Sequence, residues 1–228
     1  MKIDETLITT GIFQQELKNR FRCVVKVDDI DEVCYVSASC RLENFIDLHN
    51  KEVQLTPSTN SSKLQHTLFA VYKNNEKKAT ILNLSLANAV VFEQLHRRLF
   101  SFLGSRKLAR REVLVEGYKA DIFIEDTKTA IEIKTIIASS RQANFPSIKS
   151  ERGLKQLEQI KVLLEKGYRV CYMFVSLSPE VKSVVLDRTT SFYSAFLDCV
   201  NCGMCYIGYS LKIKSGEIYV ATRIEVNI

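Results

Sequence analysis

Apolar and polar positions alternate in short runs between residues 20 and 85. The runs read F-R-C-V-V-K-V, E-V-C-Y-V-S-A, K-E-V-Q-L-T, H-T-L-F-A-V-Y and K-A-T-I-L-N-L, and polar turns separate them at residues 28–31, 57–62 and 73–76. A period of two predicts strands with one buried face. About five short strands at regular spacing, without a helix, predict a small closed sheet, for which the five-stranded OB barrel is the obvious candidate.

The period becomes helical after residue 85. Apolar residues lie three and four apart in L-A-N-A-V-V-F-E-Q-L-H-R-R-L-F-S-F-L, a stretch that ends before Gly104. We therefore place a domain boundary here, with an OB-like barrel at residues 1–85 and a second domain at residues 86–228.

The second domain alternates between strand and helix patterns. Three strands are expected in V-L-V-E-G-Y, A-D-I-F-I and T-A-I-E-I-K-T-I-I, followed by a polar loop at residues 139–146. A helix from Ser150 to a left-handed cap at Gly167, the apolar strand Y-R-V-C-Y-M-F-V-S, a helix over residues 191–200 and the strand C-Y-I-G-Y-S complete the order. This order predicts an α/β domain with a mixed sheet.

Composition excludes several classes of protein. The chain has 228 residues and is 46% apolar, which is enough for an ordinary core. No window approaches the ~18 to 20 apolar residues of a membrane span, and the start lacks the layout of a signal peptide. We expect a cytoplasmic protein without a membrane partner. Seven scattered cysteines indicate reduced thiols rather than a disulfide framework.

The net charge of +6 lies entirely in the second part of the chain. Residues 1–85 carry 11 Lys and Arg against 11 Asp and Glu, whereas residues 86–228 carry 21 against 15. A polyanion should therefore be attracted to the second part. A solvated basic helix end is the alternative interpretation of its densest run, which comprises Arg97, Arg98, Arg106, Lys107, Arg110 and Arg111.

Three charged residues interrupt two apolar strand patterns. Asp121 lies in A-D-I-F-I, and Glu132 and Lys134 lie in A-I-E-I-K-T with one Ile between them. Side chains alternate along a strand, so Glu132 and Lys134 share a face, and a turn near residues 126–127 brings Asp121 opposite or diagonal to Glu132. A solvent-facing hairpin can carry this pattern by chance. The apolar neighbours instead favour a core position, where charges need partners.

Such a group has the chemistry for phosphodiester hydrolysis. Two carboxylates without His or Cys suit Mg²⁺ or Mn²⁺. A lysine on the same face can orient an attacking water and stabilise charge on the phosphoryl group. Glu93, on the preceding helix, is the best candidate for a further acidic ligand.

The same residues resemble a known family. The arrangement is similar to the PD-(D/E)xK nuclease fold, and R-R-E-V-L-V-E-G-Y-K-A-D-I-F-I, A-I-E-I-K-T and F-P-S-I-K-S-E-R-G-L-K-Q-L resemble the sugar fermentation stimulation protein A (SfsA) family, as do K-L-Q-H-T-L-F-A-V and N-A-V-V-F-E. The resemblance implies an OB-like domain joined to a restriction-endonuclease-like domain, DNA binding and a regulatory role in sugar metabolism.

The resemblance also implies site residues. Asp121 and Glu132 become metal ligands, Lys134 the catalytic lysine and Glu93 the helix acid. The family's remaining motif positions correspond to Arg111, Ser150, Glu151, Arg152, Gly153 and Lys155.

Some positions depart from the family pattern. Residues 36–41, V-S-A-S-C-R, replace a Pro-Asn-Thr-Gly turn, Gln156 replaces an expected His, and Tyr118-Lys119 replaces a Ser-Arg pair. The first two changes put a contact on the barrel surface and an acid/base or substrate contact in doubt. The three charged residues at the centre of the pattern are unchanged.

Other signals have structural explanations as well. Cys199, Cys202 and Cys205 form C-x2-C-x2-C but lack an obvious fourth ligand. Ser150 is suited either to an N-cap or to a phosphate contact, and Arg152 and Lys155 either to a solvated helix face or to a phosphate contact.

The leading hypothesis is a metal-dependent nuclease that binds nucleic acid, DNA in preference to RNA, with the barrel guiding a strand. Its predicted nucleic-acid contacts are Arg97, Arg98, Arg110, Arg111, Ser150, Arg152 and Lys155. A non-enzymatic DNA-binding regulator with a vestigial site is the alternative, and a sugar- or protein-binding module on the neutral barrel is a third class. The sequence leaves a homodimer open.

Overall fold

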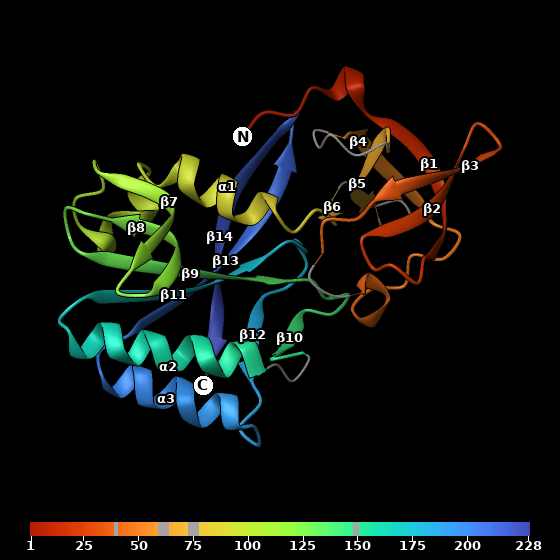
Figure 1. Cartoon of the computed structure of the whole chain (residues 1–228). Helices are drawn as coiled ribbons and strands as arrows, with labels where there is room; N and C mark the ends of the chain where they lie inside the picture. The colour runs from red at the N-terminus through yellow and green to blue at the C-terminus, as the bar shows by residue number, and fades with distance from the viewer. Residues whose placement is uncertain (39–40, 59–63, 73–77, 148–150) are drawn as a thin grey trace.

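The computed structural model consists of a β-barrel that lies beside a larger sheet flanked by helices (Figure 1). It describes residues 1–38, 41–58, 64–72, 78–147 and 151–228. The predicted turn positions 59–62 and 73–76, residues 39–40 and Ser150 lie outside the described residues.

The barrel is closed by five strands in the order β1-β2-β3-β5-β4. Its last contact is the parallel pairing of Tyr35 on β3 with Thr67 on β5. The OB-like barrel predicted from the sequence is confirmed. The strands are β1 (Thr9–Glu16), β2 (Arg22–Val27), β3 (Ile30–Tyr35), β4 (Glu52–Pro57) and β5 (His66–Tyr72).

The five strands that close the barrel differ from the five that we predicted. Strand β1 precedes the region that we assigned to strands, and β6 (Ala79–Ile81) pairs with β5 outside the closed ring. Glu16 obscures the alternation in β1, because this buried carboxylate accepts hydrogen bonds from the backbone N–H groups of Leu42 and Glu43 at 3.0 and 3.1 Å. Within residues 20–85, where no helix was expected, the described chain forms one short 3-10 helix at Leu42–Asn44 and no α-helix.

The second sheet is mixed, as predicted. Strands β9, β11 and β13 are parallel, whereas β7, β8 and β9 are antiparallel neighbours, as are β13 and β14. In the described part of the chain its order is β10 (Gln142–Phe145), β12 (Ser183–Leu186), β14 (Glu217–Asn227), β13 (Cys205–Lys214), β11 (Arg169–Ser176), β9 (Thr129–Ile136), β8 (Tyr118–Ile124) and β7 (Ala109–Val115).

Three of these strands were missed in the sequence. Strand β10 lies inside the predicted polar loop, and β12 and β14 lie in segments to which we assigned no structure. The short strands β10 and β12 pair in parallel, and β12 pairs with β14, so tertiary pairing rather than local pattern defines them.

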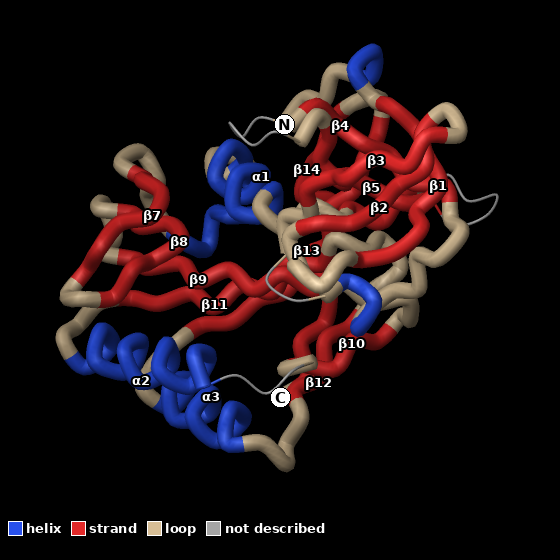
Figure 2. Tube along the Cα trace, turned by 45° about the vertical axis from the view of Figure 1, so that its right-hand side comes forward, coloured by secondary structure: helices blue, strands red, loops and turns tan. Residues whose placement is uncertain are grey.

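Helices cover both faces of the second sheet. Helix α1 (Leu86–Gln94) lies on the barrel side, and α2 (Glu151–Glu165) and α3 (Ser191–Asn201) lie together on the opposite side (Figures 1 and 2). Gly167 has φ of +83°, as expected for a left-handed cap after α2. Among the described residues, no helix has the length and apolar character needed to cross a membrane.

The helix expected over residues 86–103 is interrupted. Helix α1 ends at Gln94, and a 3-10 helix, η3, spans Arg98–Leu103. The Gln94 side chain donates to the Ile218 carbonyl at 3.1 Å and accepts from the Val220 N–H at 3.0 Å. These bonds hold the end of α1 on β14, and the chain turns there.

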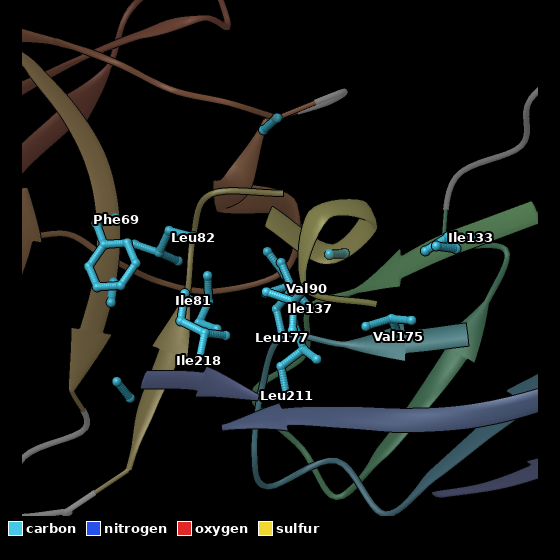
Figure 3. Close-up of a cluster of buried hydrophobic side chains, with 14 of the residues drawn as sticks. Phe69, Ile81, Leu82, Val90, Ile133, Ile137, Val175, Leu177, Leu211 and Ile218 are labelled. Atoms are coloured by element: carbon cyan, nitrogen blue, oxygen red, sulfur yellow. The ribbon is translucent and has the colours of Figure 1, made fainter. Parts of the chain in front are cut away.

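One hydrophobic core runs from the barrel into the second sheet. Phe69 of β5 and Leu82 contact the same buried cluster as Val90 of α1, Ile133 of β9 and Leu211 of β13 (Figure 3). The core therefore continues across residue 85, and the domain boundary placed there stays a prediction.

Candidate functional site

The hairpin of β8 and β9 carries the two acids. Its ladder pairs Ile124 with Thr129 and Ile122 with Ile131, so Asp121 and Glu132 occupy the next opposed position. Residues 125–128 form the turn, as expected. At the acid pair, Asp121 Oδ2 accepts the backbone N–H of Ile133 at 2.7 Å. A side chain thus takes the place of a strand carbonyl, and the carboxylate is held at the point where the ladder ends.

Asp121 is also held from helix α1. The Asn88 side-chain amide donates to Asp121 Oδ1 at 2.9 Å. Burial, followed by the negative charge of Glu132, raises the pKa of Asp121 to about 6, although the Ile133 N–H, Lys134 and Asn88 oppose this change. The charge on Asp121 is therefore incompletely compensated, and a cation beside it would lower the pKa.

Glu132 is almost fully buried and accepts three side-chain hydrogen bonds. Its side chain is on β9, and the residue is 3% exposed. Lys134 Nζ donates to Oε1 at 2.6 Å, Gln156 Nε2 donates to the same oxygen at 3.0 Å, and the Tyr118 hydroxyl donates to Oε2. Lys134 and Glu132 therefore share a face, as their spacing predicts.

Gln156 links helix α2 to this pair. Its Oε1 accepts from Lys134 Nζ at 2.6 Å, while its Nε2 bonds to Glu132, so the three side chains form a closed triangle. The amide supplies one donor and one acceptor to two opposite charges, and it fixes the position of the Lys134 ammonium group.

Two tyrosines form the wall beside Glu132. Tyr118 lies on β8, and Tyr172 on β11 is directly paired with Glu132. Lys134 Nζ lies 5.9 Å from the centre of the Tyr172 ring. Burial and the nearby carboxylates raise the pKa of both phenols, so both remain neutral hydrogen-bond donors. Within the described chain, the Tyr172 hydroxyl has no hydrogen-bond partner.

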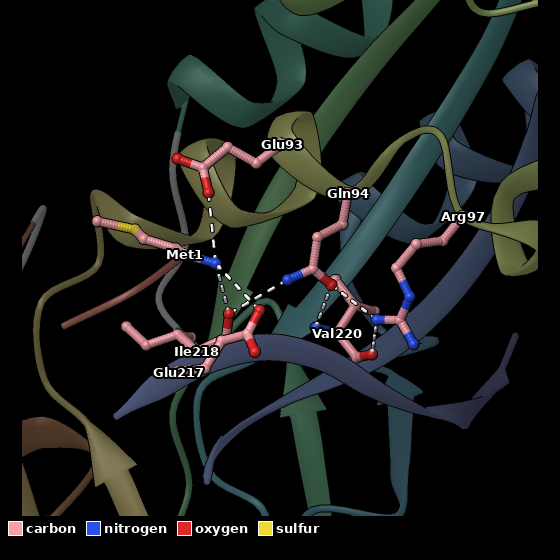
Figure 4. A network of polar contacts seen from close by, with 7 residues as sticks. All are labelled: Met1, Glu93, Gln94, Arg97, Glu217, Ile218 and Val220. Atoms are coloured by element: carbon pink, nitrogen blue, oxygen red, sulfur yellow. Dashed lines mark hydrogen bonds and ion pairs between the residues drawn. The ribbon is translucent and has the colours of Figure 1, made fainter. Parts of the chain in front are cut away.

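The structure does not bring Glu93 together with the two acids, and its role as a ligand stays a prediction. Its Oε2 lies 3.3 Å from the amino group of Met1, and the side chain is 51% exposed (Figure 4). Glu93 is five residues after Asn88, and a helix turns about 100° per residue, so the two side chains point in different directions. Among the residues that the structure describes, no group of three Asp, Glu, His or Cys side chains could hold a metal.

The predicted nucleic-acid contacts separate into structural and exposed residues. Arg97 donates to Gln94 Oε1 and to the Val220 carbonyl, both at 2.7 Å (Figure 4), and Arg110 is paired with Glu125. Ser150 lies outside the described residues. Arg98, Arg111, Arg152 and Lys155 are exposed, and so is Arg110 despite its ion pair with Glu125.

The carboxylates can still accept a cation. Within the described chain, Asp121 Oδ1, Asp121 Oδ2 and Glu132 Oε2 each accept one hydrogen bond, whereas Glu132 Oε1 accepts two. A carboxylate oxygen has two lone pairs, so the first three oxygens retain capacity for a hard cation. The donor set fits Mg²⁺ or Mn²⁺, with water completing the coordination.

Sequence reasoning missed the residues that orient the acids. Tyr118 and Gln156 stood out as departures from the family pattern, and Asn88 begins the matched text N-A-V-V-F-E. Each of these signals was present but not assigned to the site. Tyr172 lies in an apolar run without any distinguishing signal.

The Cys-x2-Cys-x2-Cys pattern does not form a cluster. Cys199 is buried, with Sγ 3.3 Å from the Leu157 carbonyl, whereas Cys202 and Cys205 are exposed. The six cysteines in the described ranges are free.

Comparisons with known proteins agree on one family. The family model described as "Sugar fermentation stimulation protein RE domain" matches residues 85–217. A "Sugar fermentation stimulation protein homolog" of Ruminiclostridium cellulolyticum is 25% identical over 228 residues, covering 97% of this chain and 98% of the relative. A homolog of Acetivibrio thermocellus is 24% identical over 223 residues, covering 95% and 94%.

A solved structure shares the fold over the whole chain. "The structure of Pyrococcus Furiosus SfsA in complex with Ca2+" superposes with a TM-score of 0.82 at 20% identity, covering 100% of both chains. This likeness extends the family match from the sequence to the arrangement of the barrel and the mixed sheet.

Proposed function

This chain belongs to the sugar fermentation stimulation protein (SfsA) family, and from that premise we propose that Asp121, Glu132 and Lys134 form a divalent-metal-dependent phosphodiesterase site for nucleic acid. The observation that carries the proposal is the ion pair of buried Glu132 with partly buried Lys134, beside partly buried Asp121. Removing a charged side chain from water is costly unless partners compensate the charge. Three such side chains close together on one sheet therefore favour a chemical role.

The ligand chemistry of the two carboxylates supports the proposal. Asp121 and Glu132 would hold Mg²⁺ or Mn²⁺, and the bound ion would polarise a phosphodiester and lower the pKa of a coordinated water. The relative from Pyrococcus furiosus is described in complex with Ca²⁺. Ca²⁺ and Mg²⁺ both take oxygen ligands, so that complex is consistent with a cation at carboxylates.

Lys134 has the geometry of a group that acts on the phosphate. Its ammonium has three N–H donors, of which Glu132 and Gln156 occupy two at 2.6 Å each. The third can be directed at a phosphoryl oxygen or at the attacking water, and it would stabilise negative charge that develops in the transition state. Gln156 and Glu132 hold the amine in place, so little reorganisation is needed.

The positive charge on α2 favours a polyanion such as nucleic acid as the substrate. Gln156 contacts Lys134, and Arg152 lies four residues earlier on the same helix, with Lys155 adjacent. Positions four apart share a helix face, so exposed Arg152 lies along the approach to the site. Phosphate contacts by these residues would hold a strand there. We propose that the bound strand is DNA, as the family resemblance implies, and that the protein acts in the cytoplasm.

The test is cleavage of labelled oligonucleotides by the purified chain. Single- and double-stranded DNA and RNA are incubated with Mg²⁺, with Mn²⁺ or with a chelator. We expect metal-dependent cleavage and a loss of at least about 100-fold in Lys134→Gln, whose amide keeps hydrogen bonding but lacks the positive charge. Cleavage that persists in the chelator, or that Lys134→Gln leaves unchanged, would contradict the proposal.

A second candidate function is DNA binding without catalysis. All four oxygens of Asp121 and Glu132 already accept protein hydrogen bonds, and no third acidic ligand joins them in the described residues. Such a site could be a stable remnant in a regulator. Binding of DNA with unchanged affinity in the chelator, and without cleavage in any metal, would favour this candidate.

A further inference from the structure

Cys171 and Cys205 are direct neighbours on adjacent strands. They form the first pair in the register of the parallel strands β11 and β13, and paired residues in a sheet project on the same face. Neighbouring strands lie about 4.8 Å apart. This spacing is within the Cα separation of about 4.4 to 6.8 Å that a disulfide tolerates.

The two thiols differ in access to solvent. Cys171 is completely buried at 0% exposure, whereas Cys205 is exposed at the first residue of β13. The turn before Cys205 contains Gly203 at φ of +99°. A strand end next to such a turn can adjust to a new covalent bond more easily than the interior of the sheet.

The surroundings of Cys205 favour its reactive form. The neighbouring Cys171 thiol and the nearby Arg169 charge lower the pKa of Cys205 to about 7, against the effect of burial. The same interaction and burial raise the pKa of Cys171. Of the two thiols, Cys205 is therefore the one that ionises more readily, as in an attacking and a resolving cysteine.

A second pair in the barrel supplies an internal contrast. Cys23 and Cys34 are also directly opposed, on the antiparallel strands β2 and β3. Both are at 0% exposure, so neither presents a sulfur to a solvent oxidant. Adjacency alone does not make a thiol pair reactive, because reaction also needs access and a thiolate.

We propose that Cys205 is a site of reversible oxidation by hydroperoxides and that Cys171 resolves it as an intramolecular disulfide. The Cys205 thiolate attacks the terminal peroxide oxygen and breaks the O–O bond, and it becomes a sulfenic acid while the other oxygen leaves after protonation, as water from hydrogen peroxide or as an alcohol from an organic hydroperoxide. Cys171 then attacks the Cys205 sulfur, forms the S–S bond and releases a water, with its thiol proton completing that water. The cysteines lose two electrons, and the peroxide gains them.

The disulfide joins the strand next to the candidate site. Cys171 immediately precedes Tyr172, which pairs with Glu132 on β9. A crosslink at Cys171 would fix one end of β11, while the acids on β8 and β9 keep their own contacts. The proposal depends on the thiol pair and not on nuclease activity.

The experiment uses the full reduced chain in its native state. The protein is treated with a small excess of hydrogen peroxide at pH 7, blocked with iodoacetamide under denaturing conditions and digested with trypsin. The peptide of residues 170–182 contains Cys171, and that of residues 189–212 contains Cys199, Cys202 and Cys205. We expect these peptides to be linked, with fragmentation locating the bond at Cys205, and to separate after dithiothreitol.

Variants distinguish the resolving reaction from random oxidation. Cys205→Ser should abolish the link, whereas Cys202→Ser, which changes the other exposed thiol of the described residues, should retain it. The Cys171→Ala variant removes the buried resolving thiol and provides a second readout. It should trap Cys205 as a sulfenic acid that reacts with dimedone.

The proposal would be overturned by an alkylatable Cys205 after peroxide treatment, by a link that uses Cys199 or Cys202, or by a link between two chains. Formation of a Cys23–Cys34 disulfide at the same rate would also contradict it, because that pair lacks the access that the proposal requires.

Discussion

The Asn88 side-chain amide donates a 2.9 Å hydrogen bond to Asp121 Oδ1, and it connects helix α1 to the first acid of the site. Removing this donor in Asn88→Ala should raise the pKa of Asp121 further above about 6 and weaken Mn²⁺ binding about tenfold at pH 7, because partners of a ligand carboxylate orient it. Titration calorimetry measures the change.

A residue on the same helix provides the control for Asn88. Glu93→Gln should leave the Mn²⁺ affinity unchanged, since Glu93 bonds to the Met1 amine and not to Asp121. If Glu93→Gln weakened binding as much as Asn88→Ala, Glu93 would be a ligand after all and the placement in Figure 4 would not describe the metal-bound protein.

Asp121 should make the metal-free protein less stable as the pH rises. Its pKa is raised from the usual 3.8 to about 6, so between these values the folded state holds a proton that the unfolded state has released. The free energy of unfolding therefore falls across this range and stays lower above it. Asp121→Asn, which cannot ionise, should be more stable than the wild type by about 1 to 2 kcal/mol at pH 8.

Urea denaturation at several pH values tests this sign. The advantage of Asp121→Asn should shrink as the pH falls through 6 towards about 4, because Asp121 is then protonated and neutral. An advantage that is constant with pH would show that Asp121 ionisation does not cause it.

Tyr118 and Tyr172 form a matched pair of substitutions. Tyr118→Phe removes a donor to Glu132 and should lower the free energy of unfolding by about 1 to 3 kcal/mol. Tyr172→Phe removes a hydroxyl that has no partner in the described chain and should be neutral or stabilising. Guanidinium denaturation at pH 7 compares them, and equal losses would contradict the different hydrogen bonding of the two phenols.

The basic residues should separate by function. Arg152→Ala and Lys155→Ala should each weaken DNA binding about three- to tenfold and reduce the salt dependence of the affinity by about one unit of slope, with little change in stability. Arg97→Ala should mainly lower the melting temperature, because Arg97 bonds to Gln94 and the Val220 carbonyl. Fluorescence anisotropy and thermal melts on the same samples make the comparison, and an Arg97→Ala variant that only lost affinity would reverse these roles.

The local sequence pattern predicted much of the fold but missed some strands and the end of one helix. Short apolar runs located β2 to β6, whereas β1 was missed because its buried positions are Gly11, Phe13 and Glu16 and its register shifts between Phe13 and Gln15. The parallel pairs that define β10 and β12 depend on residues about 40 positions apart, which no local pattern contains. The end of α1 likewise depends on bonds from Gln94 to β14.

The candidate site shows the same limit. Strand alternation and a short turn were sufficient to bring Asp121, Glu132 and Lys134 together. Asn88 and Gln156 reach them from helices on opposite faces of the sheet, and helical spacing alone does not say which side chain meets a strand. Glu93 was chosen by residue type, and its position on α1 points it elsewhere.

Mn²⁺ binding by the metal-free full chain, measured by titration calorimetry at pH 7.5, tests the central claim most directly. The wild type should bind Mn²⁺ at one site, and Glu132→Gln, which keeps the size of the side chain but loses its charge, should bind at least about 30-fold more weakly while remaining folded by circular dichroism. No specific uptake by the wild type, or equal affinity in the folded Glu132→Gln variant, would contradict a metal site at Asp121 and Glu132.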